Sequence, residues 1–143
     1  MISPLVLLVD DEVPFVETMT KRLNKRQLRV LPAYSGREAL EKLEDNAVDV
    51  VILDVKMPGM DGIETLREIK RAHPLVEVIM LTGHATVETA VEGMRLGAFD
   101  YLMKPCEIEE LLAKVGEAKE KKSEHEQKII AARMKEITLR RGM

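Results

Sequence analysis

Charged and hydroxyl side chains stand directly after the most apolar stretches of this chain, at the positions where buried strands would end. Two of these stretches, LVLLV (5–9) and VVIL (50–53), run straight into carboxylates. Two later stretches are followed by a Thr-Gly pair and by a lysine. In chain order the four sets are Asp10-Asp11-Glu12, Asp54, Thr82-Gly83 and Lys104. A carboxylate nucleophile with further acids, a hydroxyl and an ammonium is the combination of groups that phosphoryl transfer uses.

These carboxylates need positive partners if they gather in one place, because like charges repel and raise one another's pKa. Lys104 supplies one fixed positive charge. Mg²⁺ is a natural second cation, since it binds through one or two carboxylates and keeps several waters. Asp11 and Asp54 are the expected direct ligands, with Asp10 acting through a water or a hydrogen bond. The hydroxyl and N–H of Thr82-Gly83, with Lys104, would donate to an anion, and no Gly-rich phosphate loop points to a nucleotide.

Each of these features has an ordinary structural explanation when it is taken alone. Acidic residues before a helix commonly cap it and complement its dipole. Asp54 opens the turn-rich segment VKMPGMDG (55–62), where an aspartate is common. A Thr or Lys after a strand usually bonds the local backbone or water. The functional interpretation therefore depends on the coincidence of all four sets, which requires the strand ends to converge.

The alternation of apolar and amphipathic segments predicts that convergence. Apolar runs of strand length, at 5–9, 28–33, 50–53, 76–81 and 99–103, alternate with amphipathic segments of helix length. The runs are continuous, which is typical of parallel strands buried on both faces. We therefore predict an α/β fold, a doubly wound five-stranded parallel sheet with five helices. In such sheets ligands bind outside the carboxyl ends of the strands, where all four sets would lie.

Residues 117–143 differ in character from the rest of the chain. They hold eight Lys or Arg against five Glu, a net charge of +3, whereas the whole chain carries -3. No strand-like run interrupts them, and Ile130, Met134 and Ile137 recur at i, i+4 and i+7. We expect the last helix to extend well beyond the domain. A solvated extension, and one that dimerises or docks on a partner, are both open.

Composition restricts the remaining function classes. The chain is 45% hydrophobic and 33% charged, with 3% aromatic residues, which suits one domain with an aliphatic core. A net charge of -3 and a pI near 5.7 argue against a nucleic-acid-binding surface over the whole chain. The single cysteine, Cys106, excludes an internal disulfide and fits a reducing compartment. We expect a cytoplasmic protein, because neither a signal peptide nor a membrane-spanning run is found.

Four motifs, in this order and spacing, resemble the receiver domain of bacterial two-component response regulators, the CheY-like family. They are VDDE (9–12), ILDVKMPGMDG (52–62), MLTGHA (80–85) and GAFDYLMKP (97–105). The resemblance covers most of the chain up to the tail, and FDYLMKP is similar to receivers of the nitrogen-regulatory class. It implies a flavodoxin/CheY-like fold with strand order 2-1-3-4-5.

The resemblance also implies a role for each of the four sets. Asp54 would accept a phosphoryl group from a phosphohistidine on a sensor histidine kinase, in a reaction that needs Mg²⁺ or Mn²⁺. Asp11, Asp54 and the main-chain carbonyl of Lys56 would bind the metal, and Asp10 would complete the acidic pocket. The phosphoryl oxygens would be bound by Thr82, Gly83 and Lys104.

A conformational switch is implied by the same resemblance. Thr82 would move to hydrogen-bond the new phosphate, and Tyr101 would rotate inward behind it, which alters the face made by the fourth helix, fifth strand and fifth helix. Without the resemblance, Tyr101 is an aromatic residue on an edge strand. Lys56 and His84, two residues after Asp54 and Thr82, overhang the site in this family; tuning of phosphoaspartate hydrolysis and simple solvation are equally open for them. Such a protein is not a conventional enzyme but catalyses its own phosphorylation and dephosphorylation.

We expect a receiver domain at residues 1–121 and a helical extension at 122–143 that is too short to be an output domain. The chain would then regulate an unidentified downstream protein, without binding nucleic acid or a membrane; a homodimer through the switch face or the tail helix is open. An alternative is the N-terminal receiver of a longer transcription regulator, against which the linker-free ending RRGM argues weakly. A haloacid-dehalogenase-like phosphohydrolase would need an acid two residues after Asp54, where Lys56 stands.

Overall fold

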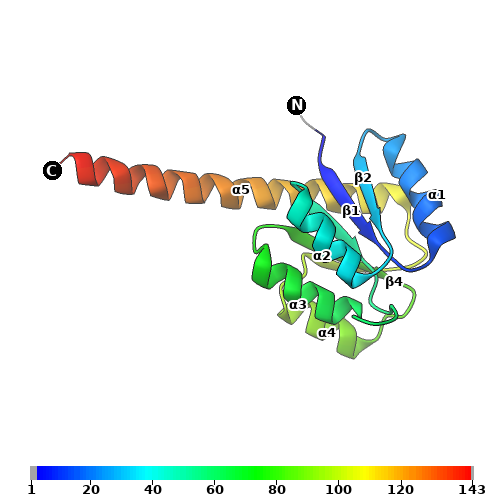
Figure 1. Ribbon diagram of the computed structural model, residues 1–143. Coiled ribbons are helices and arrows are strands. Elements are labelled where there is room, and N and C mark those ends of the chain that lie inside the picture. The colour runs from blue at the N-terminus through cyan, green and yellow to red at the C-terminus, as the bar shows by residue number, and fades with distance from the viewer. Residues whose placement is uncertain (1–2, 143) are drawn as a thin grey trace.

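A five-stranded parallel sheet forms the centre of the computed structural model, which describes residues 3–142 (Figure 1). The strand order is β2-β1-β3-β4-β5, so the predicted doubly wound α/β fold is confirmed. The strands are β1 (Leu5–Val9), β2 (Arg29–Ala33), β3 (Val50–Leu53), β4 (Glu77–Thr82) and β5 (Asp100–Met103). The helices are α1 (Val13–Asn24), α2 (Gly36–Asp45), α3 (Gly62–Ala72), α4 (Val87–Arg95) and α5 (Ile108–Arg141).

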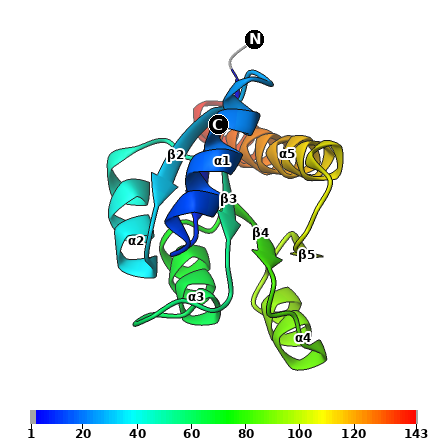
Figure 2. The same cartoon turned by 90° about the vertical axis from the view of Figure 1, so that its right-hand side faces the viewer.

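Helices cover both faces of the sheet, which explains why the strands are continuously apolar (Figure 2). α1 and α5 pack on one face, where Val16, Leu23 and Leu111 belong to a single core cluster. α2 and α3 pack on the other face through Leu43 and Leu66, and α4 lies beside α3. β3 and β4 are buried along their whole length. Burial on two faces fixes the strand ends that carry the charged sets.

The parallel register brings the carboxyl ends of the central strands together. Val9 pairs with Leu53, and Leu53 pairs in turn with Met80. The Asp54 N–H continues this ladder by donating to the Val9 carbonyl at 3.0 Å. Asp10 and Asp54, the residues that follow β1 and β3, are therefore neighbours at one edge of the sheet.

Local side-chain bonds start the helices at this edge. Ser35 and Asp61 each accept a hydrogen bond from the backbone N–H three residues later, at 3.1 and 2.9 Å. At α4, Thr86 and Thr89 form a reciprocal capping box. Gly97 follows α4 with a φ of 102°, a left-handed conformation that glycine adopts readily at the end of a helix. The direction in which the chain leaves these loops is thus set by residues within a few positions of each helix end.

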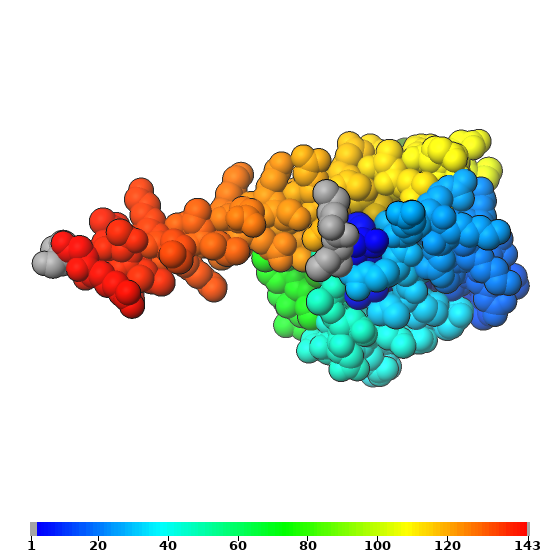
Figure 3. Space-filling model, turned by 90° about the horizontal axis from the view of Figure 1, so that it is seen from above, coloured from blue at the N-terminus to red at the C-terminus, as the bar shows by residue number. Residues whose placement is uncertain are grey.

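α5 runs well beyond the sheet, which confirms the predicted helical extension (Figures 1 and 3). Lys119 and Lys122 hold its middle to the domain, at 3.1 and 3.2 Å from the Asp49 Oδ1. Burial by itself raises the pKa of Asp49, but hydrogen bonds from the Leu5 N–H and the two lysines outweigh it and lower the pKa. Charge pairing therefore fixes the direction of α5 where it leaves the domain.

Beyond this anchor, residues 127–142 are exposed. The predicted domain boundary at residue 121 stays a prediction. Between residues 3 and 142, no helix is both long enough and apolar enough to cross a membrane.

Gly62 is required by the close packing of α3 against the end of β3. Its N–H donates to the Val55 carbonyl at 2.7 Å, and a Cβ there would overlap the Asp54 carbonyl oxygen and lie 2.6 Å from the Val55 Cα. Gly62→Ala must push this segment away, so we expect it to lower the free energy of unfolding by about 2 kcal/mol or more. Urea unfolding measures the change. Gly116→Ala, in α5 with open space around it, is the matched control and should raise stability by about 0.5–1 kcal/mol. Equal stability of Gly62→Ala and the wild-type chain would contradict this account.

Candidate functional site

Asp54 is held rigidly at the edge of the sheet, directly after β3. Its side chain is buried, with the residue only 3% exposed. The Val55 N–H donates to its Oδ1 at 2.9 Å, while its own N–H donates to the Val9 carbonyl. The carboxylate therefore has little freedom, and its position is set by the two strands on which the sheet is centred.

Three carboxylates converge at this edge. Oxygens of Asp10, Glu12 and Asp54 all lie within 4.8 Å of one another. Asp10 is 1% exposed, whereas Glu12 is exposed. The Glu12 N–H donates to the Asp10 Oδ1 at 2.9 Å, which turns the chain at the end of β1 and aims both acids at the same place. Such a cluster concentrates negative charge outside the sheet.

Lys104 crosses from the end of β5 to neutralise this charge. Its Nζ lies 2.6 Å from the Asp10 Oδ2 and 3.2 Å from the Glu12 Oε1, and 4.0 Å from the centre of the Phe15 ring. The Lys104 N–H donates to the Thr82 carbonyl at 2.9 Å, so the backbone that carries the lysine is tied to the end of β4. The side chain is 15% exposed, which strengthens its attraction to the acids.

Burial and the neighbouring charges shift the pKa values of Asp54 and Lys104. Burial raises the pKa of Asp54, and the charge of Asp10 raises it further, although a hydrogen bond from Thr82 and the charge of Lys104 act in the opposite direction. Burial by itself lowers the pKa of Lys104, but the hydrogen bond and charge of Asp10, with the charge of Asp54, outweigh it and raise the pKa. Lys104 is therefore held in its charged form, while the ionised form of Asp54 is disfavoured.

An open pocket of about 460 Å³ lies outside the cluster. Two predicted ligands, Asp11 and Asp54, line it together with Glu12, and so do Lys56 and His84, for which tuning of hydrolysis and simple solvation both remain open. Thr82 is fully buried beside the pocket at the end of β4, where its hydroxyl accepts a hydrogen bond from the His84 N–H at 3.0 Å. A small ligand that enters this pocket would meet the acids together with Lys56 and His84.

Tyr101 lies apart from this pocket, on β5. Its hydroxyl is 2.7 Å from the hydroxyl of Thr89, the residue that completes the capping box of α4. The ring also packs close to Gly93, the buried residue of α4. The predicted switch residue is therefore attached to α4, at the face that the sequence predicts to change.

The structure brings most of the predicted site residues to one edge of the sheet. Asp10, Asp54 and Lys104 interact directly, and Thr82 lies beside them. The exposed Gly83 follows Thr82, with open space where a side chain would stand. Glu12 carries no predicted role, yet it belongs to the carboxylate cluster. Its place two residues after Asp10 in the acidic triplet is the signal that would have identified it.

The carboxylate cluster fits a hard divalent cation. All its ligand atoms are carboxylate oxygens, which Mg²⁺ prefers, and the adjoining pocket leaves room for the waters that Mg²⁺ retains. Burial, and after it the charge of Asp10, keep the pKa of Asp54 raised although Lys104 acts in the opposite direction, so a further cation would favour its ionised form. Asp10, Glu12 and Asp54 can hold such a cation, and Asp11 lines the same pocket.

The parallel sheet of order 2-1-3-4-5, with acids after β1 and β3 and a lysine after β5, defines the CheY-like class of α/β proteins. The chain belongs to the response regulator receiver domain family, whose pattern matches residues 6–116. The resemblance stated from the sequence motifs is thereby confirmed.

The chain is also similar in sequence and in structure to individual known proteins. The chain is 41% identical over 113 residues to the transcriptional regulatory protein ZraR of Escherichia coli (strain K12), a match that covers 79% of this chain and 26% of that protein. It is 39% identical over 111 residues to the DNA-binding transcriptional regulator NtrC of Klebsiella pneumoniae, covering 78% and 24%. It thus spans about a quarter of the length of these relatives. A CheY-like receiver domain protein from Methanospirillum hungatei JF-1 superposes with a TM-score of 0.82 at 29% identity, covering 86% and 98% of the two chains.

Asp54→Asn should stabilise the domain near neutral pH. Folding raises the pKa of Asp54 above its usual value of 3.8, so the folded chain binds more protons than the unfolded chain between the two pKa values. Stability therefore falls as pH rises through this window, and the penalty is complete above it. A neutral amide removes the penalty. We expect a higher melting temperature than that of the wild-type chain at pH 7, followed by circular dichroism.

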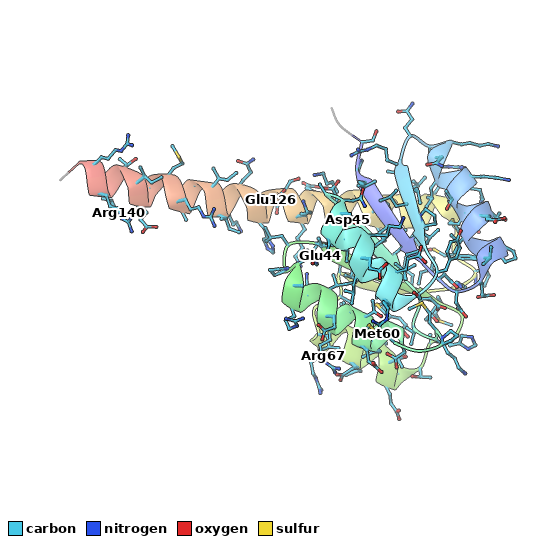
Figure 4. All side chains as sticks on the ribbon, viewed as in Figure 1. Glu44, Asp45, Met60, Arg67, Glu126 and Arg140 are labelled. Atoms are coloured by element: carbon cyan, nitrogen blue, oxygen red, sulfur yellow. The ribbon has the colours of Figure 1, made fainter. Side chains whose placement is uncertain are left out.

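The pH dependence separates this effect from a general change in packing. The difference between variant and wild type should disappear below about pH 3.8, where the carboxyl is protonated in both states. Asp45→Asn, at the exposed end of α2 (labelled in Figure 4), is the control and should leave the melting temperature unchanged. A lower melting temperature for Asp54→Asn at pH 7 would contradict the electrostatic account.

Proposed function

We propose that this chain is the phosphoacceptor of a two-component system, in which Asp54 receives a phosphoryl group from a sensor histidine kinase in a Mg²⁺-dependent reaction. One observation carries the proposal: Asp54 is buried next to two further carboxylates and Lys104, at the wall of an open pocket. An aspartate that served only to open a turn would have no need of this surrounding charge. Membership of the receiver family supports a histidine kinase as the donor.

The groups around Asp54 suit an in-line displacement. A carboxylate oxygen of Asp54 forms the new bond to phosphorus, while the bond from phosphorus to the donor's imidazole nitrogen breaks and the imidazole leaves with that electron pair. Asp10, Glu12 and Asp54 would hold Mg²⁺, which when bound would supply positive charge for the phosphoryl oxygens. Lys104, already among these acids, supplies the second positive charge and can turn towards a phosphoryl oxygen. Burial of Asp54 limits the access of water to the product.

Phosphorylation changes the hydrogen bonding at the end of β4. The new group carries about -1.5 to -2 charges and three acceptor oxygens, all of which need donors. The Thr82 hydroxyl accepts from the His84 N–H, so its own hydrogen remains available to donate towards Asp54. One or two charge-assisted bonds, about 1.5–3 kcal/mol each, are sufficient to invert an equilibrium between two states separated by a few kcal/mol.

The bond between Tyr101 and Thr89 connects this change to α4. Inward rotation of Tyr101 behind Thr82 breaks the 2.7 Å contact between the two hydroxyls. Thr89 then keeps only its bonds to Thr86 at the start of α4. The face formed by α4, β5 and α5 would change in this way, and it is the surface through which a cytoplasmic partner protein would be regulated.

A second candidate function follows from the relatives. ZraR and NtrC are transcription regulators, and the segment that matches this chain makes up about a quarter of each. The same phosphoacceptor chemistry would then control a transcription regulator of which residues 6–116 form the receiver. Both candidates share Asp54 as the phosphoacceptor and differ only in what the switch controls.

Labelling with radioactive acetyl phosphate and Mg²⁺ tests the assignment of Asp54. The wild-type chain should acquire an alkali-labile label, as expected of an acyl phosphate, and chelation of the metal should abolish it. Asp54→Asn should remove the label completely, because an amide oxygen is a far poorer nucleophile than a carboxylate. Asp45→Asn should be labelled like the wild type. Unchanged labelling of Asp54→Asn would overturn the proposal.

Two variants decide which neighbour of Asp10 binds the metal. Asp11 and Glu12 both line the pocket through which a cation would enter, but Glu12 is already engaged by Lys104, at 3.2 Å. We therefore expect Asp11→Asn to weaken Mg²⁺ binding about tenfold or more, the loss of about 1.4 kcal/mol, and Glu12→Gln to weaken it less. A Mg²⁺ titration followed by NMR measures both. A larger loss for Glu12→Gln would identify Glu12 as the ligand instead.

A further inference from the structure

The end of α5 presents an apolar stripe that no part of the described chain covers. Ile130, Met134 and Ile137 recur at i, i+4 and i+7, so they share one face of the helix. All three are exposed, Met134 by 59%. Figure 4 shows the neighbouring side chain of Arg140, like the whole end of α5, standing clear of the domain. Isolated amphipathic helices gain most of their stability from a surface that covers such a stripe.

α4 carries a second stripe of the same spacing. Val87, Val91 and Met94 also recur at i, i+4 and i+7, and they are 81%, 51% and 48% exposed. The helix buries only Gly93. The first and last residues of each stripe are seven positions apart, about 10 Å along the helix, so the two stripes match in length.

The charges beside the two stripes are opposite. α4 (Val87–Arg95) carries Glu88 and Glu92 against Arg95, a net charge of -1. Glu92 pairs with Arg67 at 3.6 Å, with its side chain 39% exposed. The segment 128–141 carries five basic residues and one glutamate, a net charge of +4. Arg133 adjoins Met134 on the tail stripe. A basic apolar stripe and an acidic apolar stripe of equal length are complementary surfaces.

The tail cannot reach α4 of its own chain. α5 is one continuous helix from Ile108 to Arg141, and the ion pairs of Lys119 and Lys122 fix where it leaves the domain. Residues 123–141 extend about 28 Å beyond that anchor. Figures 1 and 3 show this part of α5 directed away from the domain. Pairing of two tails is disfavoured, since it would bring two segments of net charge +4 together.

We propose that the tail of one copy docks on α4 of a second copy of this chain, with Ile130, Met134 and Ile137 against Val87, Val91 and Met94. Two copies related by a two-fold axis make both contacts at once. The contact needs no phosphoryl group on Asp54, and its test uses the unphosphorylated chain, so it can fail while the proposed function stands. Since α4 belongs to the face that the proposed function expects to change, phosphorylation would alter the strength of this contact. In this dimer the C-terminal extension of α5 would act as an arm that joins two copies of the chain.

Analytical ultracentrifugation of the full chain tests this interface with two variants. Met134→Lys disables the tail and leaves α4 intact, whereas Val91→Lys disables α4 and leaves the tail intact. The wild-type chain should sediment as a dimer, and each variant alone should associate about tenfold or more weakly. An equimolar mixture of the two variants should associate again, because the intact tail of one fits the intact α4 of the other.

The remaining outcomes overturn the proposal in distinct ways. A Val91→Lys chain that dimerises normally indicates tail-to-tail pairing, and a Met134→Lys chain that does so indicates pairing of two α4 faces. If the wild-type chain is monomeric, the two stripes do not bind each other, and a different protein would have to cover them. Leu139→Lys is the matched control, since Leu139 is 62% exposed on the opposite side of the same helix, and it should dimerise like the wild type. Circular dichroism of each variant confirms that α5 remains helical.

Discussion

The Lys104 ammonium lies 2.6 Å from Asp10 and 3.2 Å from Glu12, at the edge of the sheet where three carboxylates meet. Parallel strands place their carboxyl ends at one edge, so acids that follow β1 and β3 necessarily repel one another there. The lysine that follows β5 relieves this repulsion across 94 residues of sequence. It does so incompletely, because the pKa of Asp54 remains raised by burial and by Asp10. A site that is partly compensated in this way favours further cations and, with them, an anion such as a phosphoryl group.

The opposite edge of the same sheet is compensated from α5. Asp49, before β3, pairs with Lys119 and Lys122, and the buried Glu77, at the start of β4, has Lys121 at 3.7 Å. These ion pairs neutralise the acids, and they also hold α5 against the domain at the place where the helix leaves it. The exposed extension and its apolar stripe are therefore held at a fixed angle to the domain, as the continuation of one helix.

Hydroxyl side chains stand at the end of β4, at the start of α4 and on β5. Thr82 stands at the end of β4, Thr86 and Thr89 cap α4, and Tyr101 bonds Thr89 from β5. Hydroxyl groups both donate and accept, so each can exchange partners without leaving a buried polar atom unpaired. α4 is also the helix with the fewest buried residues, which makes it the element that such an exchange can move most easily. The hydroxyl groups at the start of α4 and the weak packing of this helix thus both indicate that α4 is the element most able to move.

The sequence by itself determined the five strands, the helices between them and the edge at which the charged residues gather. Continuous apolar runs such as VVIL (50–53) can be satisfied only by burial on both faces, and the residue after such a run, Asp54, must then stand at the edge. Only the tertiary structure decided which side chains meet there. Glu12, rather than Asp11, joins Asp10 and Asp54, because the turn after β1 and the reach of Lys104 set the direction of each side chain. Likewise the attachment of Tyr101 to Thr89 depends on how α4 packs beside β5, a contact between residues whose spacing carries no local pattern. Local sequence fixes where a residue stands along an element, whereas long-range packing fixes what its side chain touches.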